Sequence, residues 1–500
     1  MTFARVATRA LLGLSAPEVQ VEVHLANGLP AFHLVGLPET AVKESRDRVR
    51  SALLMAGFEF PSRRITVNLS PADLPKEGGR YDLAIALGIL VATGQLAEAC
   101  LEGIVFIGEL ALNADLSQIR GVLPTALVVH QQQLALALPA ANRDEASLVQ
   151  GLPLYPASSL LDLVAQLERR QPQSCSPPTL APAAPSLYPD LSSVKGQLFA
   201  KRALEIAAAG QHNLLLNGPP GSGKTLLASC LPGLLPPLDE SEALEVAAMA
   251  SISQGFDVRR WRQRPYRAPH HSSSAAALVG GGSHPQPGEI SLAHRGVLFL
   301  DELPEYDRRV LEVLREPLES GEIHLARARS RATYPAQFLL MSAMNPCPCG
   351  FLGHPHKACQ CSPHQVQRYQ SRVSGPLLDR IDLHVKVAAV PAEDLFARPA
   401  EETSHAVRER VCQARARQLA RAGKLNGQLS AAELERDAIL QPAEKTLLIE
   451  AMQRLQLSAR SAHRLLKVAR TLADLQQSEQ IERQHLLEAL SYRPASSGVN

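Results

Sequence analysis

The sequence predicts an α/β protein of two or three domains, and three observations support this prediction. First, the chain has 500 residues, of which 45% are hydrophobic, and this is more than one hydrophobic core usually accommodates. Second, an apolar strand at 214–216 runs into a glycine-rich turn and then a helix, an order typical of nucleotide-binding α/β domains. Third, helical spacing of apolar residues dominates from residue 391 to residue 500.

A proline-rich stretch divides the chain. Six prolines fall between residues 172 and 189, and proline fixes φ and lacks a backbone donor, so 171–189 is expected to be a semi-rigid linker. Residues 1–170 then form an α/β N-terminal domain, 190–390 an α/β core and 391–500 a helical domain. In the N-terminal domain, alternation over 19–37 around Asn27-Gly28 predicts two strands paired through a tight turn, and 81–94 is predicted to be a buried helix.

Composition restricts the function. Lys and Arg number 51 and Asp and Glu 49, which gives a net charge of +2. This balance excludes a chain that coats nucleic acid through bulk charge, but it allows a locally basic channel. No segment has the features of a signal peptide or the length of a membrane span, so we expect a cytoplasmic protein with no membrane partner.

A phosphate-binding loop is the most specific motif. The run from Gly218 to Thr225 matches G-x-x-x-x-G-K-[ST], in which backbone N–H groups and the next helix surround a phosphate. Lys224 is expected to reach the β- and γ-phosphates of ATP, and the Thr225 hydroxyl to bind Mg²⁺. The residues expected to contact the nucleotide are Gly218, Pro219, Pro220, Gly221, Ser222, Gly223, Lys224, Thr225 and Leu226.

Two later strands end in polar side chains. The apolar run 297–300 is followed by Asp301, expected to coordinate Mg²⁺, and by Glu302, expected to act as the general base. The run 338–344 is followed by Asn345, which is expected to orient the attacking water. An Asn-Pro pair at this place would also suit a plain turn.

Four of the eight cysteines lie close together. Cys347 and Cys349 form one pair and Cys359 and Cys361 the other, and four thiolates in two close pairs can surround one tetrahedral Zn²⁺. We therefore expect a structural zinc ion in an insertion at 347–361, with a reduced, metal-free loop as the alternative. Candidate substitute ligands are His354, His356 and His364.

A basic hairpin is predicted between Glu302 and Asn345. Two strand-like runs flank three alternate arginines, Arg327, Arg329 and Arg331, which could follow the phosphates of single-stranded or branched DNA. A solvated tip without a partner is the alternative. The stretch 264–271, with the sequence RPYRAPHH, is a candidate for a second DNA-contacting loop.

The motifs together resemble the magnesium-chelatase-like AAA+ ATPases, and in particular their ComM/YifB type. The resemblance covers nearly the whole chain and rests on GPPGSGKT, GVLFLDELPE, SAMNPCPCG, GPLLDRIDLHV and SARSAHRLLKVARTLADL. It implies an AAA+ P-loop ATPase core with a helical lid, a homohexameric ring with ATP held between subunits, and ATP-dependent helicase or translocase activity on DNA.

The resemblance also assigns roles to single residues. Arg380 matches the arginine finger that reaches a neighbour's γ-phosphate, Arg460 matches the sensor arginine of the lid, and Asn345 matches the first sensor. Sequence spacing alone would equally suit an ion pair of Arg380 with Asp379 or Asp382, and a solvated helix face for Arg460.

The N-terminal domain resembles the Lon protease fold over residues 71–82. Arg80 occupies the position where that fold places its nucleophilic serine, so we expect a Lon-protease-like domain without proteolytic activity. A role in assembly or in DNA contact is expected instead.

Three functions fit these residues. The first is a hexameric DNA motor that drives branch migration during recombination of incoming DNA in natural transformation. The second is a magnesium-chelatase motor subunit that remodels a protein partner for metal insertion, and the third is an ATP-binding switch without turnover. The complete hydrolytic set argues against the third, and the basic hairpin and four-cysteine loop favour the first over the second.

Overall fold

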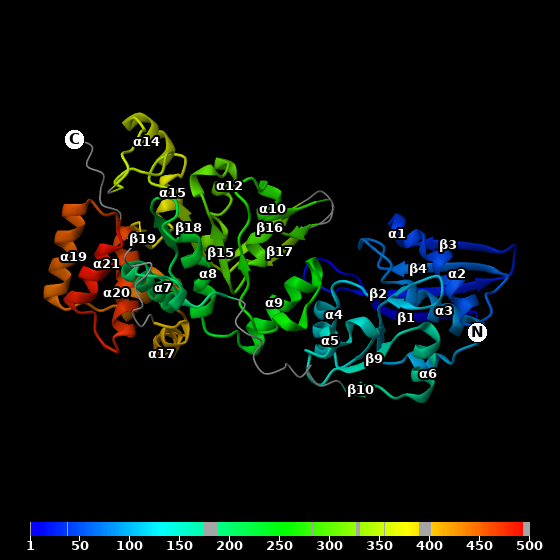
Figure 1. Cartoon of the computed structure of the whole chain (residues 1–500). Helices are drawn as coiled ribbons and strands as arrows, with labels where there is room; N and C mark the ends of the chain where they lie inside the picture. Colours follow the sequence, from blue (N-terminus) through cyan, green and yellow to red (C-terminus); the bar gives the residue numbers. More distant parts are fainter. Residues whose placement is uncertain are drawn as a thin grey trace. The chain divides into compact units, whose positions relative to one another are not determined.

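The computed structural model describes residues 2–37, 39–174, 188–282, 285–326, 331–354, 356–389 and 402–493, without the side chains at 40, 41 and 331. Contacts within the chain divide it into two units (Figure 1). Unit 1 comprises Met1–Pro182 and Ala243–Trp261, and unit 2 comprises Ala183–Glu242 and Arg262–Asn500. Among the described residues, no helix has the length and apolar character needed to cross a membrane.

Unit 1 contains two four-stranded sheets. The first has the order β1-β2-β4-β3 and is antiparallel except for the β3–β4 pair. The second has the order β10-β9-β8-β5 and is parallel except for the β10–β9 pair. The strands of these sheets, together with the short pair β6–β7, are β1 (Phe3–Arg9), β2 (Glu18–Ala26), β3 (Ala31–Val35), β4 (Arg64–Ser70), β5 (Ile104–Phe106), β6 (Glu109–Leu110), β7 (Leu116–Ser117), β8 (Ala135–Pro139), β9 (Pro153–Ala157) and β10 (Gln173–Ser174).

Helix α3 (Asp82–Thr93) fills the core of unit 1. Its residues 82–92 are all buried, and it packs on β1 and β2, which confirms the buried helix predicted from the uniformly apolar sequence. It ends at Gly94, which has a φ of 78° and so a left-handed conformation that suits glycine. The other helices of this unit are α1 (Thr40–Lys43), α2 (Ser45–Met55), α4 (Val122–Gln131), α5 (Arg143–Ala146) and α6 (Leu160–Arg169).

The tight hairpin predicted around Asn27-Gly28 is wrong. β2 and β3 do not pair with each other, because β4 lies between them, antiparallel to β2 and parallel to β3. Helices α1 and α2 form the crossover that a parallel β3–β4 pair requires. Alternation of apolar residues reports that a strand is half-buried, but it does not identify the neighbouring strand.

Most of helix α9 (Glu240–Ser253) and the segment after it belong to unit 1. Ala247 and Ala248 lie in a buried cluster with residues of α4, β8 and β9. The backbone N–H of Gly121 donates a hydrogen bond to the carbonyl of Ser251 over 3.1 Å. A segment that follows the phosphate loop in sequence thus completes the core of the first unit.

Unit 2 is built on a five-stranded parallel sheet with the order β12-β15-β18-β11-β19. Every residue of β15 and β18 is buried, as expected for a parallel sheet covered on both faces. The strands are β11 (Leu214–Asn217), β12 (Tyr266–Arg267), β15 (Val297–Leu300), β18 (Leu339–Met344) and β19 (Leu383–Lys386), with the antiparallel pairs β13 (Gly280–Gly281) and β14 (Gln286–Pro287), and β16 (Glu322–Ala326) and β17 (Arg331–Pro335).

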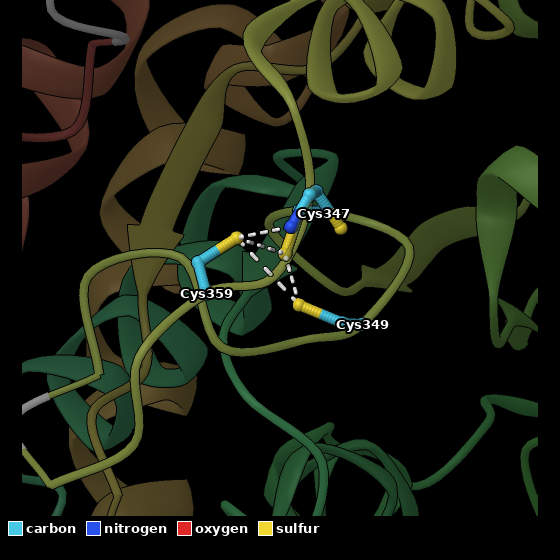
Figure 2. A group of neighbouring side chains, drawn as sticks. Cys347, Cys349 and Cys359 are labelled. Atoms are coloured by element: carbon cyan, nitrogen blue, oxygen red, sulfur yellow. Dashed lines mark hydrogen bonds between the residues drawn. The ribbon is translucent and has the colours of Figure 1, made fainter.

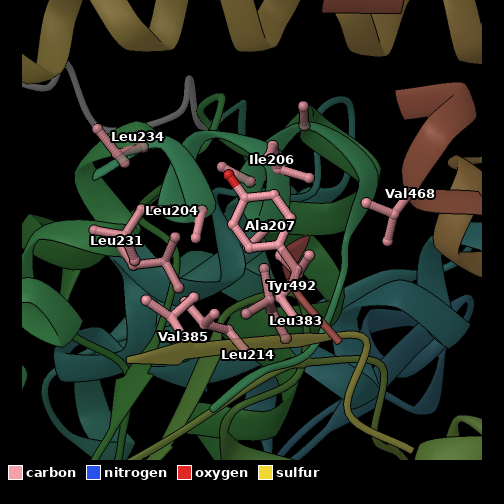
Figure 3. Close-up of a cluster of buried hydrophobic side chains, with 14 of the residues drawn as sticks. Leu204, Ile206, Ala207, Leu214, Leu231, Leu234, Leu383, Val385, Val468 and Tyr492 are labelled. Atoms are coloured by element: carbon pink, nitrogen blue, oxygen red, sulfur yellow. The ribbon is translucent and has the colours of Figure 1, made fainter. Parts of the chain in front are cut away.

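The C-terminal helices share a hydrophobic core with this sheet. Val468 and Tyr492 lie in one buried cluster with Leu204, Leu214 and Leu383, so the helical tail packs against α7 (Leu198–Gly210), β11 and β19 (Figure 3). The helices of unit 2 are α7 (Leu198–Gly210), α8 (Lys224–Leu234), α10 (Ala275–Val279), α11 (Glu289–Leu292), α12 (Arg308–Glu312), α13 (Pro317–Ser320), α14 (Pro363–Gln370), α15 (Gly375–Leu378), α17 (Ser404–Ala422), α18 (Ala431–Asp437), α19 (Pro442–Leu455), α20 (Ala459–Leu475) and α21 (Arg483–Ser491).

Candidate active site

The carboxyl ends of three adjacent strands carry the polar residues of the site. In the order β15-β18-β11, β15 is followed by Asp301 and Glu302, β18 by Asn345, and β11 by the phosphate loop. Parallel strands end at the same edge of their sheet, which is where open α/β sheets bind their ligands. The structure therefore brings together segments that are far apart in the chain.

The phosphate loop is held at both ends. The backbone N–H of Gly218 donates to the carbonyl of Met344 over 3.2 Å, which ties the loop to β18. At the other end, Gly223 has a φ of 86°, a left-handed conformation that glycine adopts without strain, and α8 begins at the next residue. The first turn of α8 therefore presents unpaired N–H groups to the loop, as anion binding requires.

Lys224 is buried beneath the loop, with 8% of its surface exposed. Its amine donates to the carbonyl oxygens of Gly218 and Pro219 over 2.7 and 2.8 Å, and to Oδ1 of Asn345 over 3.2 Å. Burial lowers the pKa of the Lys224 amine, and two nearby carboxylates oppose that effect. The cation is thus held at the phosphate loop by three oxygen acceptors, one of which is the predicted sensor side chain.

Thr225 and Asp301 form the predicted magnesium pair. The Thr225 hydroxyl donates to Oδ2 of Asp301 over 2.8 Å, and Oδ1 of Asp301 accepts the backbone N–H of Glu302 over 2.9 Å. Hydroxyl and carboxylate oxygens are hard ligands of the kind Mg²⁺ takes together with nucleotide phosphates. The pair therefore fits the ion that the sequence predicts here.

Glu302 lies against a histidine that the sequence interpretation did not assign to this site. Its Oε2 is 3.0 Å from Nδ1 of His271, and its side chain is 52% exposed. Both residues line a cavity of about 550 Å³ beside the magnesium pair. The other residues that line it are Thr225, Leu226, Ser229, Tyr266, Ala268, Pro269, His270, Phe299 and Asp301.

The stretch 264–271, considered above as a second DNA-contacting loop, has both of its arginines paired within the chain, and its contact with DNA stays a prediction. Arg264 is largely buried and donates to the carbonyls of Pro236 and Arg295 and to Glu242. Arg267 pairs with Glu289. Both guanidinium groups are engaged within unit 2, and the end of the stretch belongs to the cavity beside Glu302.

Arg380 lies at the opposite edge of the sheet from the phosphate loop. Its carbonyl accepts a hydrogen bond from the side chain of Asn213 over 2.9 Å, and Asn213 directly precedes β11, whereas the loop follows β11. A four-residue strand separates the two edges by roughly 13 Å, at about 3.3 Å per residue. The Arg380 side chain is 8% exposed and pairs with Glu319, not with Asp379 or Asp382.

A basic cavity of about 730 Å³ surrounds Arg380 at this edge. Arg464 and Lys467 of α20 also line it, together with Asp382, whose carboxylate lies 3.9 Å from Arg464. Arg460, the predicted sensor arginine, is exposed in the first turn of the same helix. Within one chain, neither Arg380 nor this cavity joins the phosphate site.

The hairpin predicted around the three arginines has its two strands in place. β16 pairs with β17 in antiparallel register, with Ala326 opposite Arg331. Arg327 and Arg329 lie outside the described residues, and so does the side chain of Arg331. The DNA-contacting role of these arginines stays a prediction.

The four cysteines form one cluster, and Figure 2 labels three of them, Cys347, Cys349 and Cys359. The Sγ atom of Cys347 is 3.4 Å from that of Cys349 and 3.6 Å from that of Cys359, and the latter two are 3.6 Å apart. All four sulfur atoms, including that of Cys361, lie within 4.8 Å of one another. A tetrahedral zinc with bonds of about 2.3 Å would hold its sulfurs roughly 3.8 Å apart, so the cluster fits such an ion.

In unit 1, Arg80 is buried and donates to the hydroxyl of Thr125 over 3.1 Å. Burial lowers the pKa of the Arg80 guanidinium. Arg80, at the position where the sequence resemblance places the nucleophilic serine of the Lon protease fold, is thus a buried, hydrogen-bonded arginine, and the Lon-like fold of this domain stays a prediction.

Comparison with family models covers most of the chain. Residues 190–395 match the model described as magnesium chelatase, subunit ChlI. Residues 21–142 match subunit ChlI of Mg-chelatase, and residues 401–493 match the C-terminal model of the same subunit.

Several curated proteins are similar over the full length. Competence protein ComM of Haemophilus influenzae is 50% identical over 499 residues, which are 99% of this chain and 98% of that protein. Uncharacterized protein YifB of Escherichia coli is 50% identical over 495 residues, which are 99% of this chain and 97% of that protein. The magnesium-chelatase 67 kDa subunit of Heliobacterium mobile is 26% identical over 42% of this chain and 34% of its own length.

Proposed function

Since the chain belongs to the magnesium-chelatase-like AAA+ ATPases of the ComM/YifB type, we propose that it is a homohexameric motor that uses ATP hydrolysis to drive branch migration of DNA. The family implies ATP and Mg²⁺ as the nucleotide and the metal. The name of the Haemophilus relative as a competence protein supports a role in recombining incoming DNA during natural transformation. We expect the protein to work in the cytoplasm, where cysteines stay reduced.

One observation carries the proposal: the phosphate loop and Arg380 lie at opposite edges of one sheet. A guanidinium there is too far from the nucleotide of its own chain to act on it. Head-to-tail packing of identical subunits apposes two different surfaces, so it would bring this basic edge to a neighbour's phosphate loop and close into a ring. An arginine supplied in this way makes turnover depend on assembly.

Each residue at the carboxyl edge then has a defined role. Lys224 would neutralise the β- and γ-phosphates, and Thr225 with Asp301 would hold Mg²⁺, which would supply positive charge for phosphoryl transfer. Glu302 accepts the proton of the attacking water, and Asn345 orients that water from its place beside Lys224.

The DNA contact is assigned to the hairpin β16–β17. The segment 327–330 connects the two strands in sequence, and the arginines at 327, 329 and 331 would repeat around a hexameric ring. A basic ring of hairpins contacts phosphates without reading bases, which is what a motor that moves along any sequence needs. The near-zero net charge of the chain is compatible with this arrangement, because only the channel has to be basic.

The alternative is a motor subunit that remodels a protein partner for metal insertion. The family models carry the name of magnesium chelatase, and the nucleotide site would serve both activities equally. The identity to the Heliobacterium chelatase subunit is only 26%, however, against 50% over the full chain for ComM. The DNA motor is therefore the better supported of the two.

The deciding experiment measures ATP-dependent processing of a labelled four-stranded DNA junction by the purified full chain. Wild-type protein should convert the junction to two-stranded products only with ATP and Mg²⁺, and Lys224→Ala should not. If wild-type protein hydrolyses ATP but leaves the junction intact, and junction DNA does not stimulate hydrolysis, the DNA motor is wrong and the protein-remodelling motor is favoured.

A further inference from the structure

The four-cysteine loop touches the phosphate loop. Gly350 follows Cys349 and packs so closely on Pro220 that a Cβ added to Gly350 would lie 2.6 Å from Cδ of Pro220. Gly350 has a φ of 81°, and its N–H donates to the carbonyl of Cys347 over 3.0 Å. A tight turn inside the cysteine loop thus presents bare backbone to the phosphate loop, where any side chain would collide.

The cysteine loop also begins next to the sensor side chain. Asn345, which accepts the hydrogen bond of Lys224, is separated from Cys347 by a single proline. The carbonyl of that proline, Pro346, accepts a hydrogen bond from the side chain of Gln370 over 3.0 Å. The segment therefore reaches the nucleotide site at two places: the side chain of Asn345 and the backbone of Gly350.

The ends of the loop are anchored in secondary structure. β18 ends at Met344, and α14 begins directly after Ser362, which forms a capping box with Gln365. The described residues between these two elements form no helix or strand. The sulfur cluster joins the two halves of the loop, Cys347 with Cys349 and Cys359 with Cys361, and the amine of Lys357 over the ring of Phe351 is a further contact between them.

We propose that the four cysteines bind one zinc ion and that the zinc-bound loop positions the phosphate loop and Asn345 for nucleotide binding. Because structural zinc supplies folding free energy to the segment that binds it, loss of the ion would release the turn at Gly350 from Pro220. The zinc touches neither ATP nor Mg²⁺ and acts only through the loop. This inference rests on the proposed nucleotide site and is independent of any action on DNA.

The first test compares zinc-loaded, zinc-stripped and zinc-reloaded forms of the full chain. Metal analysis should find about one zinc per chain in the loaded form. The affinity for a fluorescent ADP analogue should fall by at least about tenfold when zinc is stripped and should return when zinc is added back. A change of this size is typical when a group that orients the binding residues, without touching the ligand, is lost. Cys359→Ser should behave as the stripped form, and Cys100→Ser, in unit 1, as the loaded wild type.

A second pair of variants keeps the metal ligands intact. Gly350→Ala should retain zinc but lose nucleotide affinity, because its new Cβ collides with Pro220. Gly353→Ala is the matched control, since Gly353 has a similar φ of 76° in the same loop but has nothing within 4 Å of its Cβ position. It should retain both zinc and nucleotide affinity.

The outcomes separate this inference from the proposed function. A well-folded chain that binds nucleotide but contains no zinc overturns the inference. So does a zinc-stripped chain whose nucleotide affinity is unchanged, or a Gly350→Ala variant that binds nucleotide as tightly as Gly353→Ala. None of these results would affect the proposed DNA motor, which is tested by junction processing. If nucleotide binding depends on zinc but the DNA junction stays intact, only the proposed DNA motor is contradicted.

Discussion

The Thr225 hydroxyl donates a hydrogen bond to the Oδ2 carboxylate oxygen of Asp301 over 2.8 Å, which connects the first turn of α8 with the end of β15. Oδ1 of the same carboxylate accepts the backbone N–H of Glu302, so the group is oriented from two sides. Two hard oxygen ligands thus point at one place beside the phosphate loop. This preorganisation makes the pair the best candidate for the metal site.

Replacing Thr225 should change the metal requirement. Thr225→Ala removes one oxygen ligand, and we expect it to raise the Mg²⁺ concentration needed for half-maximal ATP hydrolysis on the order of 10- to 100-fold. Thr225→Ser keeps the hydroxyl and should restore the wild-type requirement. Titration of Mg²⁺ at fixed ATP measures both, and equal Mg²⁺ dependence in the two variants would contradict the assignment.

Glu302→Gln should separate binding from turnover. The amide keeps the size of the side chain but does not accept a proton, so hydrolysis should fall by roughly 10²- to 10⁴-fold, the range for a general base. Nucleotide affinity should be nearly unchanged. Glu305→Gln is the control, because Glu305 is exposed in the turn after Glu302 and pairs with Arg372. Steady-state hydrolysis by Glu302→Gln at the rate of the control would remove Glu302 from the catalytic role.

The grouping of the candidate nucleotide-site residues could be predicted from the sequence because each of them follows a recognisable apolar strand. Lys224, Asp301 and Asn345 come directly after or close behind buried runs, and parallel strands bring such positions to one edge of the sheet. The local sequence pattern indicates which strands are buried and where each strand ends. These two properties suffice to place the candidate residues at one edge of the sheet.

Other features were beyond the sequence because they depend on tertiary packing. The alternation around Asn27 predicts strands correctly, but it does not reveal that β4 separates them. The helical pattern of α9 does not indicate that most of it packs in unit 1. His271 meets Glu302, and Gly350 meets Pro220, across segments whose spacing in sequence follows no motif.

Mixing two inactive variants should test the role of Arg380. Arg380→Ala alone should lower ATP hydrolysis by about 10³-fold or more, the range for an arginine finger, and Lys224→Ala should be inactive. In a random 1:1 mixed ring, about one interface in four pairs an intact phosphate loop with an intact arginine of its neighbour, so up to about a quarter of the wild-type rate should return. If rings shown to contain both variants recover no ATP hydrolysis, the action of Arg380 on a neighbouring subunit is contradicted.

The hairpin arginines should control DNA affinity and its salt dependence. Changing Arg327, Arg329 and Arg331 to Ala together removes three positive charges per subunit, so affinity for a single strand should fall. The slope of log affinity against log salt should flatten by about 0.7 for each phosphate that is no longer neutralised. Hydrolysis without DNA should be retained. Arg259→Ala and Arg260→Ala together are the control on an exposed turn of unit 1. An unchanged slope in the hairpin variant would remove the hairpin from the DNA path.

Acid should destabilise the chain through His384. Burial, and to a smaller extent the positive charge of Arg493, lower the pKa of His384 to about 4, whereas the unfolded side chain keeps an ordinary value near 6.5. Between these values the unfolded chain binds the extra proton, so the stabilisation is fully present above about pH 6.5 and is lost as the pH falls toward about 4. The loss of unfolding free energy amounts to at most about 3 kcal/mol.

His384→Gln should therefore show a smaller fall in the midpoint temperature of unfolding between pH 7 and pH 4.5 than wild type does. The comparison is of the two falls, so a different midpoint of the variant at neutral pH does not affect it. His405→Gln, at an exposed position of α17, should follow wild type. Burial also lowers the pKa of His485, which is present in all three proteins and so leaves the comparison unaffected. Parallel pH profiles for wild type and His384→Gln would show that His384 titrates alike in the folded and unfolded chain.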